Sequence, residues 1–423
     1  MKRPLFIFCV LASAAAALYG QKAEMLRFTV DAGKYLRINT PVSADLSSTI
    51  VSDSVSLQLY ELLKGKESEV PCQFENGVSP RLWWILSGTT VAGSKREYIL
   101  YRTENICYMP TVVVENTGDL LKLNKKNLPV LDYHITLIYP PDGVDTMYKR
   151  NAFIHPLYSP SGNILTRINP PDHYHHVGIW NPWTQVKIRD HVTDFWNLYS
   201  HQGTVRFAGI NSTINGPVYG GFNVLQEHVD FQGKRPEEIT INEVWDVRVW
   251  NTDPVDGQGA WLVDITSLLS IPGENEVILE AYRYGGGLGF RATAEWDNNN
   301  SWVNTSEGKT RVDADGTRAR WTDAGGMFPG KGESGIVFLS HPSNREHPEP
   351  MRVWPPDQNS RGDVFFEFCP IRFNEWKLKP GIVYCQKYRL LVYDGRVDKT
   401  VSERIWNDFA FPPAVTIVKV KNK

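Results

Sequence analysis

The sequence predicts a mainly β protein: a large antiparallel β-sandwich with a smaller N-terminal β domain and a short C-terminal helix. Apolar and polar residues alternate with the period of a half-buried strand, most clearly in ITINEVWDVRVW (239–250). Turn signals such as PPDG (140–143) and YGGG (284–287) recur along the chain. The middle of the chain carries no long amphipathic helical pattern, so antiparallel sheets are expected to form its core.

The first element is expected to be a secretory signal peptide, residues 1–20. Lys2 and Arg3 precede an apolar run that ends at Leu18, and small residues follow before Gln21. A membrane anchor is the less favoured alternative, because the run is short for a bilayer span. We therefore expect a periplasmic or secreted protein without a membrane span, and its oligomeric state is left open.

Residues 21–125 are expected to form the N-terminal β domain, with a sandwich-like arrangement. This strand-rich block runs to TVVVENTG and is followed by KLNKKN (122–127), which we interpret as a polar bridge. The bridge marks a shift in composition, so the main domain is expected to begin at residue 126.

The main sandwich is expected to span residues 126–412, with clear strands at 335–341 and 384–394. Near its end, Thr400 and Glu403 have the spacing of a capping box, which predicts a helix. The apolar face of this helix would carry Val401, Ile405 and Phe409. Residues 413–423 are expected to be a C-terminal tail.

Composition narrows the classes of partner. The 423 residues are 42% hydrophobic and 22% charged, which indicates a folded globular protein. The formal net charge of -2 argues against nucleic acid, which usually needs a basic surface. The 14 tryptophans offer flat faces for apolar ligand surfaces, including the C–H faces of sugars, but tryptophans also fill cores.

Four cysteines lie beyond the predicted signal peptide. In an exported protein the economical disulfides are Cys72 with Cys107 and Cys369 with Cys385. Four free, buried thiols are an equal alternative. The spacing contains no C-x-x-C of the kind found in zinc sites.

Histidines gather in PPDHYHHVGIWNPWT (170–184), where His173, His175 and His176 fall within four positions. In an extended strand, His173 and His175 would share one face and His176 would point to the other. The cluster can bind substrate or transfer protons, ligate a metal together with a carboxylate, or satisfy loop backbone groups. The spacing does not match a known metal motif, so no cofactor is assigned and a metal stays open. The carboxylates within reach are Asp172, Asp190 and Asp194.

A second histidine-bearing segment is FLSHPSNREHPEP (338–350), which contains His341 and His347. We expect it to meet the first segment on one face of a sheet. Ser340 precedes His341 without a G-x-S-x-G motif, so serine-hydrolase chemistry is not supported.

Two further polar positions interrupt apolar patterns. Glu243 is the only ionisable group on one face of 239–250, which suits a general acid or base with a raised pKa. The alternative is a buried pair of Glu243 with an arginine, for which Arg248, Arg283 and Arg291 are candidates. Beyond the YGGG turn, Arg291, Thr293 and Glu295 form a polar face that is either solvated or part of a ligand cleft.

The order of motifs resembles a known family over roughly residues 128–412. The motifs are FIHPLYSPSGNILTRINPPDHYHHVGIW, TDFW (193–196), YGGGLGFRATAEW, TSEG (305–308), ARWTDAGG (319–326), HPSNREHPEPMRVWPP (341–356) and YRLLVYDG (388–395). Together they resemble a bacterial family labelled "methane oxygenase PmoA-like". Val177 stands where that family usually has arginine, and WPP stands where aromatic–histidine pairs are common, so the chain departs from the family pattern at these two places. A membrane methane monooxygenase subunit needs several spanning helices, so the label does not describe this chain's activity.

The resemblance implies an exported protein of bacteria that degrade complex carbohydrates. Its fold is expected to be similar to the galactose-mutarotase-type supersandwich. In proteins of that type a sugar lies across the concave sheet, and His and Glu side chains act as acid and base.

The leading hypothesis is therefore a carbohydrate-active hydrolase, lyase or epimerase that uses His/Glu acid–base chemistry. The predicted catalytic residues are His155, His173, His175, His176, Glu243 and His341. The predicted substrate-binding residues are Trp180, Trp183, Trp196, Arg291, Glu295, Asn344, Arg345 and His347, with Arg291 and Arg345 suited to a carboxylate. The alternatives are a non-catalytic glycan-binding protein and a histidine-ligated metal-dependent hydrolase or oxygenase. The enzyme hypothesis requires His173 or His175 to lie with His341 and an acid in one pocket.

Overall fold

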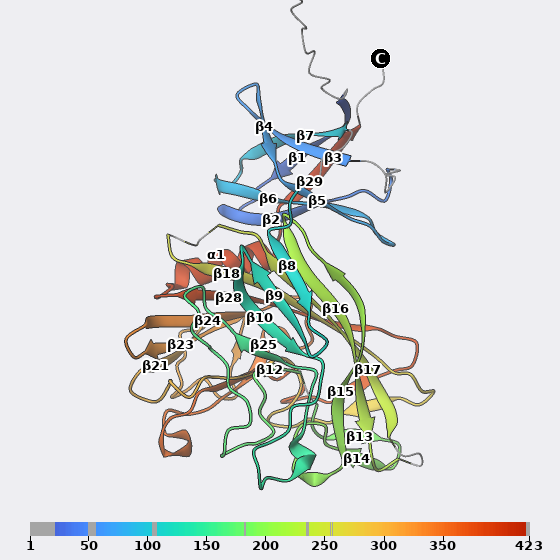
Figure 1. The fold of residues 1–423 in the computed structure, drawn as a ribbon, viewed down its shortest axis with the longest axis vertical. Helices are drawn as coiled ribbons and strands as arrows, with labels where there is room; N and C mark the ends of the chain where they lie inside the picture. The colour runs from blue at the N-terminus through green and yellow to red at the C-terminus, as the bar shows by residue number, and fades with distance from the viewer. Residues whose placement is uncertain are drawn as a thin grey trace, which may run out of the picture.

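The computed structural model describes residues 22–49, 56–103, 108–181, 183–233, 237–253, 255 and 257–419. The predicted signal peptide and Cys107 lie outside these residues. No helix among the described residues is long and apolar enough to cross a membrane. The described chain is mainly β, as expected, with antiparallel sheets in two lobes (Figure 1).

The N-terminal lobe is a small sandwich of two sheets that share one core. Apolar residues of both sheets, such as Phe28 and Trp84, pack against each other there. The five-stranded sheet has the order β29-β1-β7-β3-β4 and the three-stranded sheet the order β2-β6-β5. The strands are β1 (Ala23–Asp31), β2 (Arg37–Asp45), β3 (Ser56–Leu63), β4 (Lys66–Val70), β5 (Cys72–Glu75), β6 (Arg81–Thr90), β7 (Lys95–Thr103) and β29 (Ala414–Lys419).

Both ends of this lobe differ from the sequence prediction. The expected tail, 413–423, contributes β29, which pairs antiparallel with β1 and returns the chain to the N-terminal lobe. The expected bridge, 122–127, lies largely in a hairpin strand that pairs with the strand after it. Alternation in the bridge is short and its outer face is polar, so its composition resembles a linker although its backbone is paired.

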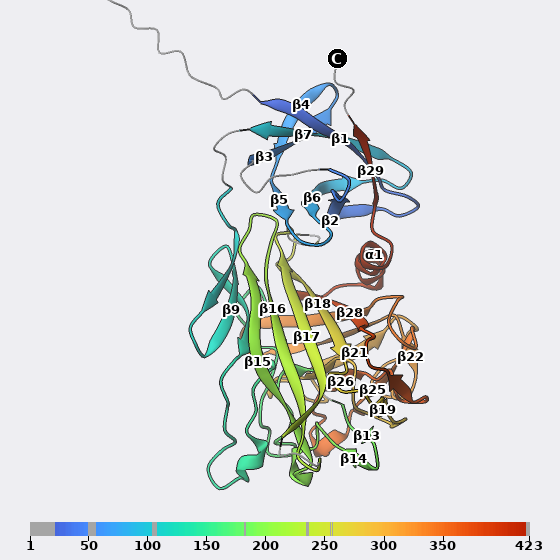
Figure 2. The ribbon, with the colours of Figure 1, turned by 90° about the vertical axis from the view of Figure 1, so that its right-hand side faces the viewer.

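The main lobe is a sandwich of two large antiparallel sheets (Figures 1 and 2). The first has the order β22-β25-β26-β20-β12-β11-β10-β9-β8. Its strands are β8 (Val112–Asn116), β9 (Leu120–Lys125), β10 (Leu128–His134), β11 (Ile154–Leu157), β12 (Ile179–Trp180), β20 (Gly289–Arg291), β22 (Arg318–Ala319), β25 (Glu349–Val353) and β26 (Phe365–Phe368).

The second large sheet has the order β15-β16-β17-β18-β28-β24-β23-β21. Its strands are β15 (Gly203–Ile214), β16 (Tyr219–Asp230), β17 (Glu238–Trp250), β18 (Ala260–Ser270), β21 (Ser301–Thr305), β23 (Trp321–Phe328), β24 (Gly332–Ser340) and β28 (Tyr384–Asp394). Tyr133 and Phe290 from the first sheet meet Trp245 and Phe338 from the second in one core. Burial of these alternate residues is the main stabilising contribution to the lobe.

Smaller elements complete the main lobe. A four-stranded sheet has the order β14-β13-β19-β27. These elements are β13 (Val186–Ile188), β14 (His191–Thr193), β19 (Val277–Leu279) and β27 (Trp376–Leu378), with short 3-10 turns η1 (Thr146–Tyr148), η2 (Leu198–Ser200) and η3 (Gln358–Ser360).

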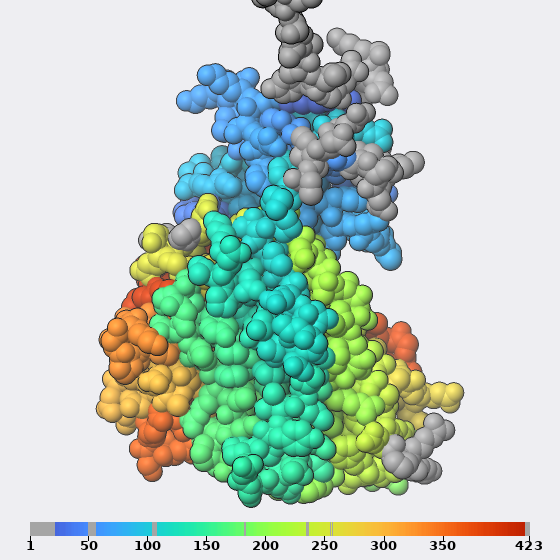
Figure 3. All heavy atoms as spheres, in the orientation of Figure 1, coloured from blue at the N-terminus to red at the C-terminus, as the bar shows by residue number. Residues whose placement is uncertain are grey.

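The predicted C-terminal helix is α1 (Lys399–Ala410), which lies where the two lobes meet (Figure 2). The smaller N-terminal lobe and the larger main lobe are also distinct in the space-filling view (Figure 3). The N-cap of α1 is Asp398, whose side chain accepts the backbone N–H of Val401 at 2.9 Å, and not the expected Thr400. Val401 and Ile405 pack on the second large sheet. Asp408 forms a buried ion pair with Arg37 of β2 at 2.8 Å, which ties the helix to the N-terminal lobe.

The described cysteines form no disulfide. Cys72, Cys369 and Cys385 are free thiols, so the predicted Cys369–Cys385 bond is wrong. The Cys369 thiol instead lies 3.4 Å from the carbonyl of Gly285. Burial raises the pKa of the Cys72 thiol to about 12, which makes it unreactive as a nucleophile.

Candidate functional site

The histidine segment folds as a pair of tight turns between β11 and β12. The N–H of His173 donates to the carbonyl of Pro170, and the N–H of His176 donates to the carbonyl of His173, both at 2.9 Å. An extended strand would separate the rings, but the turns bring all three together. The ring centroids of His173, His175 and His176 lie 4.7 to 5.4 Å apart.

These rings line one side of a cavity of about 200 Å³, called the histidine pocket here. Its aromatic lining comes from four places that are distant in the sequence: Trp196, Tyr284, Trp354 and Phe365. This volume is below the roughly 300–1,000 Å³ typical of pockets for drug-sized ligands. The pocket therefore suits a small molecule or one ring of a longer chain.

The pocket also has a polar lining, formed by Asn197, Arg283, Arg352 and Gln358. Asn197 follows the TDFW motif, Arg283 precedes the glycine-rich turn, and Arg352 and Gln358 flank WPP. Sequence reasoning did not name these side chains as candidates for a binding site, and Arg283 was considered only as a partner of Glu243. The sequence signal that could have identified them is their position beside TDFW, the glycine-rich turn and WPP, which are motifs of the family pattern.

His173 is held by a carboxylate. Its Nδ1 lies 2.8 Å from Oδ2 of Asp172, and Arg291 donates to both oxygens of Asp172 at 2.8 and 3.0 Å. Burial opposes ionisation of Asp172, but the hydrogen bond from His173 and the charge of Arg291 outweigh it and hold the pKa of Asp172 well below its usual range. An ionised Asp172 accepts the Nδ1 proton, so the Nε2 lone pair of His173 is free to act as a base.

The other two histidines are uncharged. Burial, reinforced by the neighbouring His173 and by the charges of Arg150 and Arg291, lowers the pKa of His175 to about 3. Burial also holds the pKa of His176 well below its usual range. Neutral imidazoles can accept and donate hydrogen bonds at neutral pH without carrying charge.

Two pocket-lining residues keep buried nitrogen atoms without a partner. Nδ1 of His176 and Nε1 of Trp196 form no hydrogen bond to any described residue. An unsatisfied buried polar atom costs about 1–3 kcal/mol. Both atoms have almost no accessible surface, so a ligand in the histidine pocket would not contact them without a rearrangement of the side chains.

Among the predicted aromatic contacts, only Trp196 lines the pocket. Trp180 lies beneath it, 5.2 Å from the ring of His176 and almost fully buried. Trp183 belongs to the sandwich core and contacts Trp376, so the expectation that it stacks on substrate is wrong. Alternation marks a tryptophan as buried but does not distinguish a core from a pocket floor.

Arg291 was expected to hold a substrate carboxylate. It is fully buried and holds Asp172 and Asp363 instead, the latter at 3.2 Å. Asp363 in turn lies 3.7 Å from Arg167. Arg291 therefore positions Asp172 and does not line the histidine pocket.

Glu243 is fully buried and is not among the residues that line the histidine pocket. Its Oε1 accepts hydrogen bonds from Asn181, Ser267 and Trp245 at 2.8, 2.6 and 2.6 Å. Its Oε2 pairs with Nε2 of His228 at 2.9 Å. The predicted acid–base role is wrong, and the buried partner is a histidine, not one of the three arginines considered.

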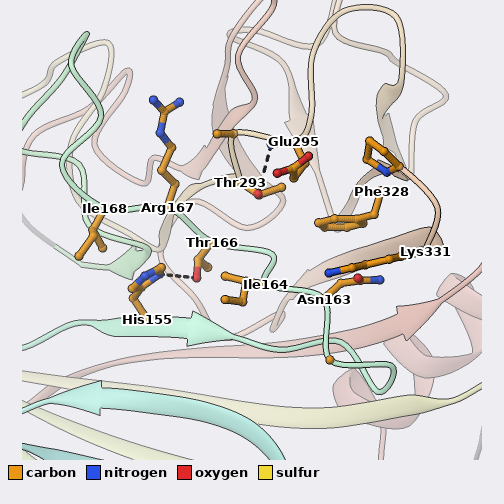
Figure 4. A pocket seen from close by; sticks show the side chains of 13 residues that line it. His155, Asn163, Ile164, Thr166, Arg167, Ile168, Thr293, Glu295, Phe328 and Lys331 are labelled. Carbon is orange, nitrogen blue, oxygen red and sulfur yellow. Dashed lines mark hydrogen bonds between the residues drawn. The ribbon is translucent and has the colours of Figure 1, made fainter.

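His155 and Glu295 line a separate, larger cavity of about 590 Å³. Nδ1 of His155 bonds to Oγ1 of Thr166 at 2.8 Å, and the N–H of Glu295 donates to Thr293, on different parts of the wall (Figure 4). Burial and the nearby His134 lower the pKa of His155 to about 4. Arg167 also lines this cavity, so the chain Arg167–Asp363–Arg291–Asp172 joins its wall to the histidine pocket.

The second histidine segment does not reach the histidine pocket. His341 packs against Phe409 of α1, and His347 stacks on Trp406. Asn344 bonds to the backbone of Lys387, and Arg345 donates to the carbonyl of Glu375 at 2.7 Å. The expected convergence of His341 with His173 or His175 is therefore wrong, whereas the expected acid is present as Asp172.

The same segment contains a buried acid with a pH-dependent role in stability. Burial raises the pKa of Glu349 to about 7, against the hydrogen bonds from Ser340, Asn344 and Tyr388. Because the folded pKa exceeds the ordinary value of 4.5, the stabilisation is complete below that value and is lost as pH rises through about 7.

We expect Glu349→Gln to remove this part of the pH dependence. The wild-type free energy of unfolding should fall by up to about 3 kcal/mol more than that of the variant between acidic and neutral pH. Urea unfolding across this range measures the difference. Parallel curves for the two proteins would contradict the assignment.

A metal centre was left open by the sequence. Within the described ranges, no group of three or more His, Cys, Asp or Glu side chains is arranged to hold a metal ion. The three rings of the histidine pocket are packed against aromatic rings, including Trp354 at 4.9 Å from His173 and Phe365 at 5.1 Å from His176.

The fold and the pocket together define a two-lobed β-sandwich protein with a histidine-lined cavity. A family model described as a family of unknown function (DUF6807) matches residues 121–407, and the chain belongs to this family. No curated protein matches the sequence.

Two solved structures are similar in fold. One is a protein in the glycosyl hydrolase family 38 from Enterococcus faecalis, with a TM-score of 0.49, 8% identity, and coverage of 94% of this chain and 47% of that chain. The other is an alpha-mannosidase from Enterococcus faecalis V583, with a TM-score of 0.47, 7% identity, and coverage of 94% and 46%. This chain thus spans less than half of each, and a likeness at this level carries no argument about activity.

Proposed function

We propose that this chain is an exported, carbohydrate-active enzyme that acts on a sugar or glycoside in the histidine pocket. The observation that carries the proposal is the Asp172–His173 pair, which presents a base at the wall of an aromatic-lined cavity. We also propose that the chain is related to the PmoA-like family and that its fold is similar to that of mutarotase-type supersandwich proteins.

The lining supports a sugar as the ligand. Trp196, Trp354 and Tyr284 supply aromatic faces, against which the C–H face of a pyranose can stack. Asn197 and Gln358 supply amide groups that can bond to hydroxyls.

The roles of the residues follow from their contacts. His173 transfers a proton through Nε2, and Asp172 fixes its tautomer. Arg291 positions Asp172 and does not itself contact the substrate. His175 and His176, which are uncharged, bind hydroxyls and do not serve as acids.

A screen of the purified protein against plant and host oligosaccharides, with detection of products, tests the proposal. Turnover that depends on His173 would support it. Saturable binding of a glycan without turnover would instead establish a non-catalytic glycan-binding protein, which the aromatic lining also suits. Turnover that is lost on chelation, with a stoichiometric metal found by elemental analysis, would establish the metal-dependent alternative.

A further inference from the structure

The charge of the histidine pocket indicates which sugars it accepts. Its described lining residues include no aspartate and no glutamate, but they include Arg283 and Arg352. The three histidines add no negative charge. A neutral sugar does not require this imbalance, whereas an anionic one is attracted by it.

Neighbouring carboxylates do not cancel the charge. Arg352 pairs with Asp315 at 2.8 Å, but Arg372 shares that same carboxylate at 3.1 Å. The guanidinium of Arg283 packs over the ring of Tyr284, 5.3 Å from its centroid. At this edge of the pocket, the only carboxylate in these contacts is that of Asp315, and three guanidinium groups lie beside it, those of Arg283, Arg352 and Arg372.

The remaining acids nearby are neutral or already engaged. Glu367 faces Arg352 across the strand pair β25–β26 and is fully buried. Burial raises its pKa well above the usual range, which favours the neutral form of this carboxyl group. Asp172 and Asp363 are both held by Arg291, and Asp194 accepts hydrogen bonds from Asn197 at 2.7 Å and from Thr184 at 2.8 Å. The excess positive charge is thus available to a ligand.

We propose that the histidine pocket binds a sugar carrying a carboxylate, a hexuronate, and cleaves its glycosidic bond by β-elimination. This inference rests on the proposed function and names its substrate class and reaction. The sequence-based expectation of carboxylate binding is retained, but Arg283 and Arg352 replace Arg291 and Arg345.

The pocket supplies the groups that β-elimination needs. Arg283 and Arg352 neutralise the uronate carboxylate, which makes the proton on the adjacent carbon, C5, more acidic. Nε2 of His173 takes that proton, the C5–H electron pair forms the C4=C5 double bond, and the C4–O bond breaks. The leaving oxygen takes a proton from the Tyr284 hydroxyl. Both side chains then exchange protons with water, so no oxidant or co-reactant is needed.

Tyr284 suits the role of acid. Burial, reinforced by the neighbouring Tyr282, raises the pKa of Tyr284 to about 12, so its hydroxyl is protonated at neutral pH. Ring contacts run from His173 to His176, then to Trp196 and on to Tyr284, with centroids 4.8, 5.7 and 5.0 Å apart. Base and acid therefore line the same small cavity and are linked by continuous ring contacts.

Hydrolysis fits the pocket less well. Most glycosidases use two carboxyl groups that flank the scissile bond. Two carboxylates lie behind the lining: Asp172 is occupied with His173 and Arg291, and Asp194 accepts hydrogen bonds from Asn197 and Thr184. A single histidine base with cationic neutralisers is better matched to elimination.

Binding provides the first test. Calorimetry with D-galacturonate and D-galactose compares two ligands that differ at C6, where one has a carboxylate and the other a hydroxymethyl group. We expect the wild-type protein to prefer galacturonate, and Arg283→Gln to weaken that binding roughly tenfold or more. Arg283→Lys should recover part of the loss, because the charge is kept. Arg345→Gln, which removes an arginine outside the pocket, should leave binding unchanged.

Turnover provides the second test and separates two kinds of failure. Uronate polysaccharides should yield unsaturated products with ultraviolet absorbance, and Tyr284→Phe and His173→Ala should abolish this signal while galacturonate still binds. Turnover of neutral glycans alone, or equal binding of galactose and galacturonate, would overturn the acidic-sugar inference and leave the proposed function intact. A protein that neither binds nor turns over any glycan would overturn both.

Discussion

Replacing His173 by alanine is expected to lower kcat roughly a hundred- to ten-thousandfold, the usual contribution of a positioned general base. His173 lines the pocket, and its Nδ1 is bound to Asp172, so Nε2 is the atom left for proton transfer. Steady-state kinetics on the substrate identified by the screen measures the effect.

Asp172→Asn should produce a loss of similar size, and the double variant should be no worse than the more affected single variant, because the two residues act as a unit. Asp363→Asn is the matched control. It removes a second carboxylate from Arg291, but Asp363 has no contact with His173. His341→Ala is expected to leave kcat unchanged, since His341 packs against Phe409 of α1. Equal losses in Asp363→Asn and Asp172→Asn would show that the carboxylate acts only on folding.

The fold class could be predicted because alternation is a local signal. The stretch 239–250 alternates strictly, and it forms most of β17, with its apolar face in the core. Residues 384–394 form β28, and 335–341 correspond to β24 with only the last residue outside. Alternation does not show which strands pair over long sequence distances. For this reason the pairing of β1 with the C-terminal strand β29 was not predicted.

The histidine pocket shows the same limit at the level of single residues. The HPSNREHP segment follows β24 of the second large sheet, so His341 and His347 stay near α1. The chain then enters the first large sheet as β25. Arg352 on β25 and Trp354 just after it both line the pocket. The family motif at 341–356 therefore does contain pocket residues, but they lie at its C-terminal end and are not its histidines.

Glu243 illustrates why a lone acid on an apolar face is ambiguous. Alternation correctly placed it inside, but its partners come from three other segments: His228 on β16, Ser267 on β18 and Asn181 after β12. Across each strand pair these are diagonal neighbours, since Gln226 and Leu269 stand directly opposite Glu243. Register and sheet stacking decide such contacts, and neither can be read from one strand.

Glu243→Ala is expected to cost about 3–5 kcal/mol of stability, because it leaves the hydrogen-bonding groups of Asn181, Ser267, Trp245 and His228 buried without an acceptor. Urea unfolding of the full chain measures this loss.

Glu243→Gln separates the structural role from a catalytic one. The glutamine oxygen can accept the three bonds that Oε1 accepts now, and its amide can donate to Nε2 of His228, whose Nδ1 has no partner among the described residues. With the imidazole proton on Nδ1, this variant should keep most of the stability and all of the turnover. A catalytic carboxylate would show the opposite pattern, with stability kept and kcat lost. A stable Glu243→Gln protein without turnover would therefore show that Glu243 takes part in the reaction. It would also favour a mechanism with two carboxyl groups, which the histidine pocket does not provide.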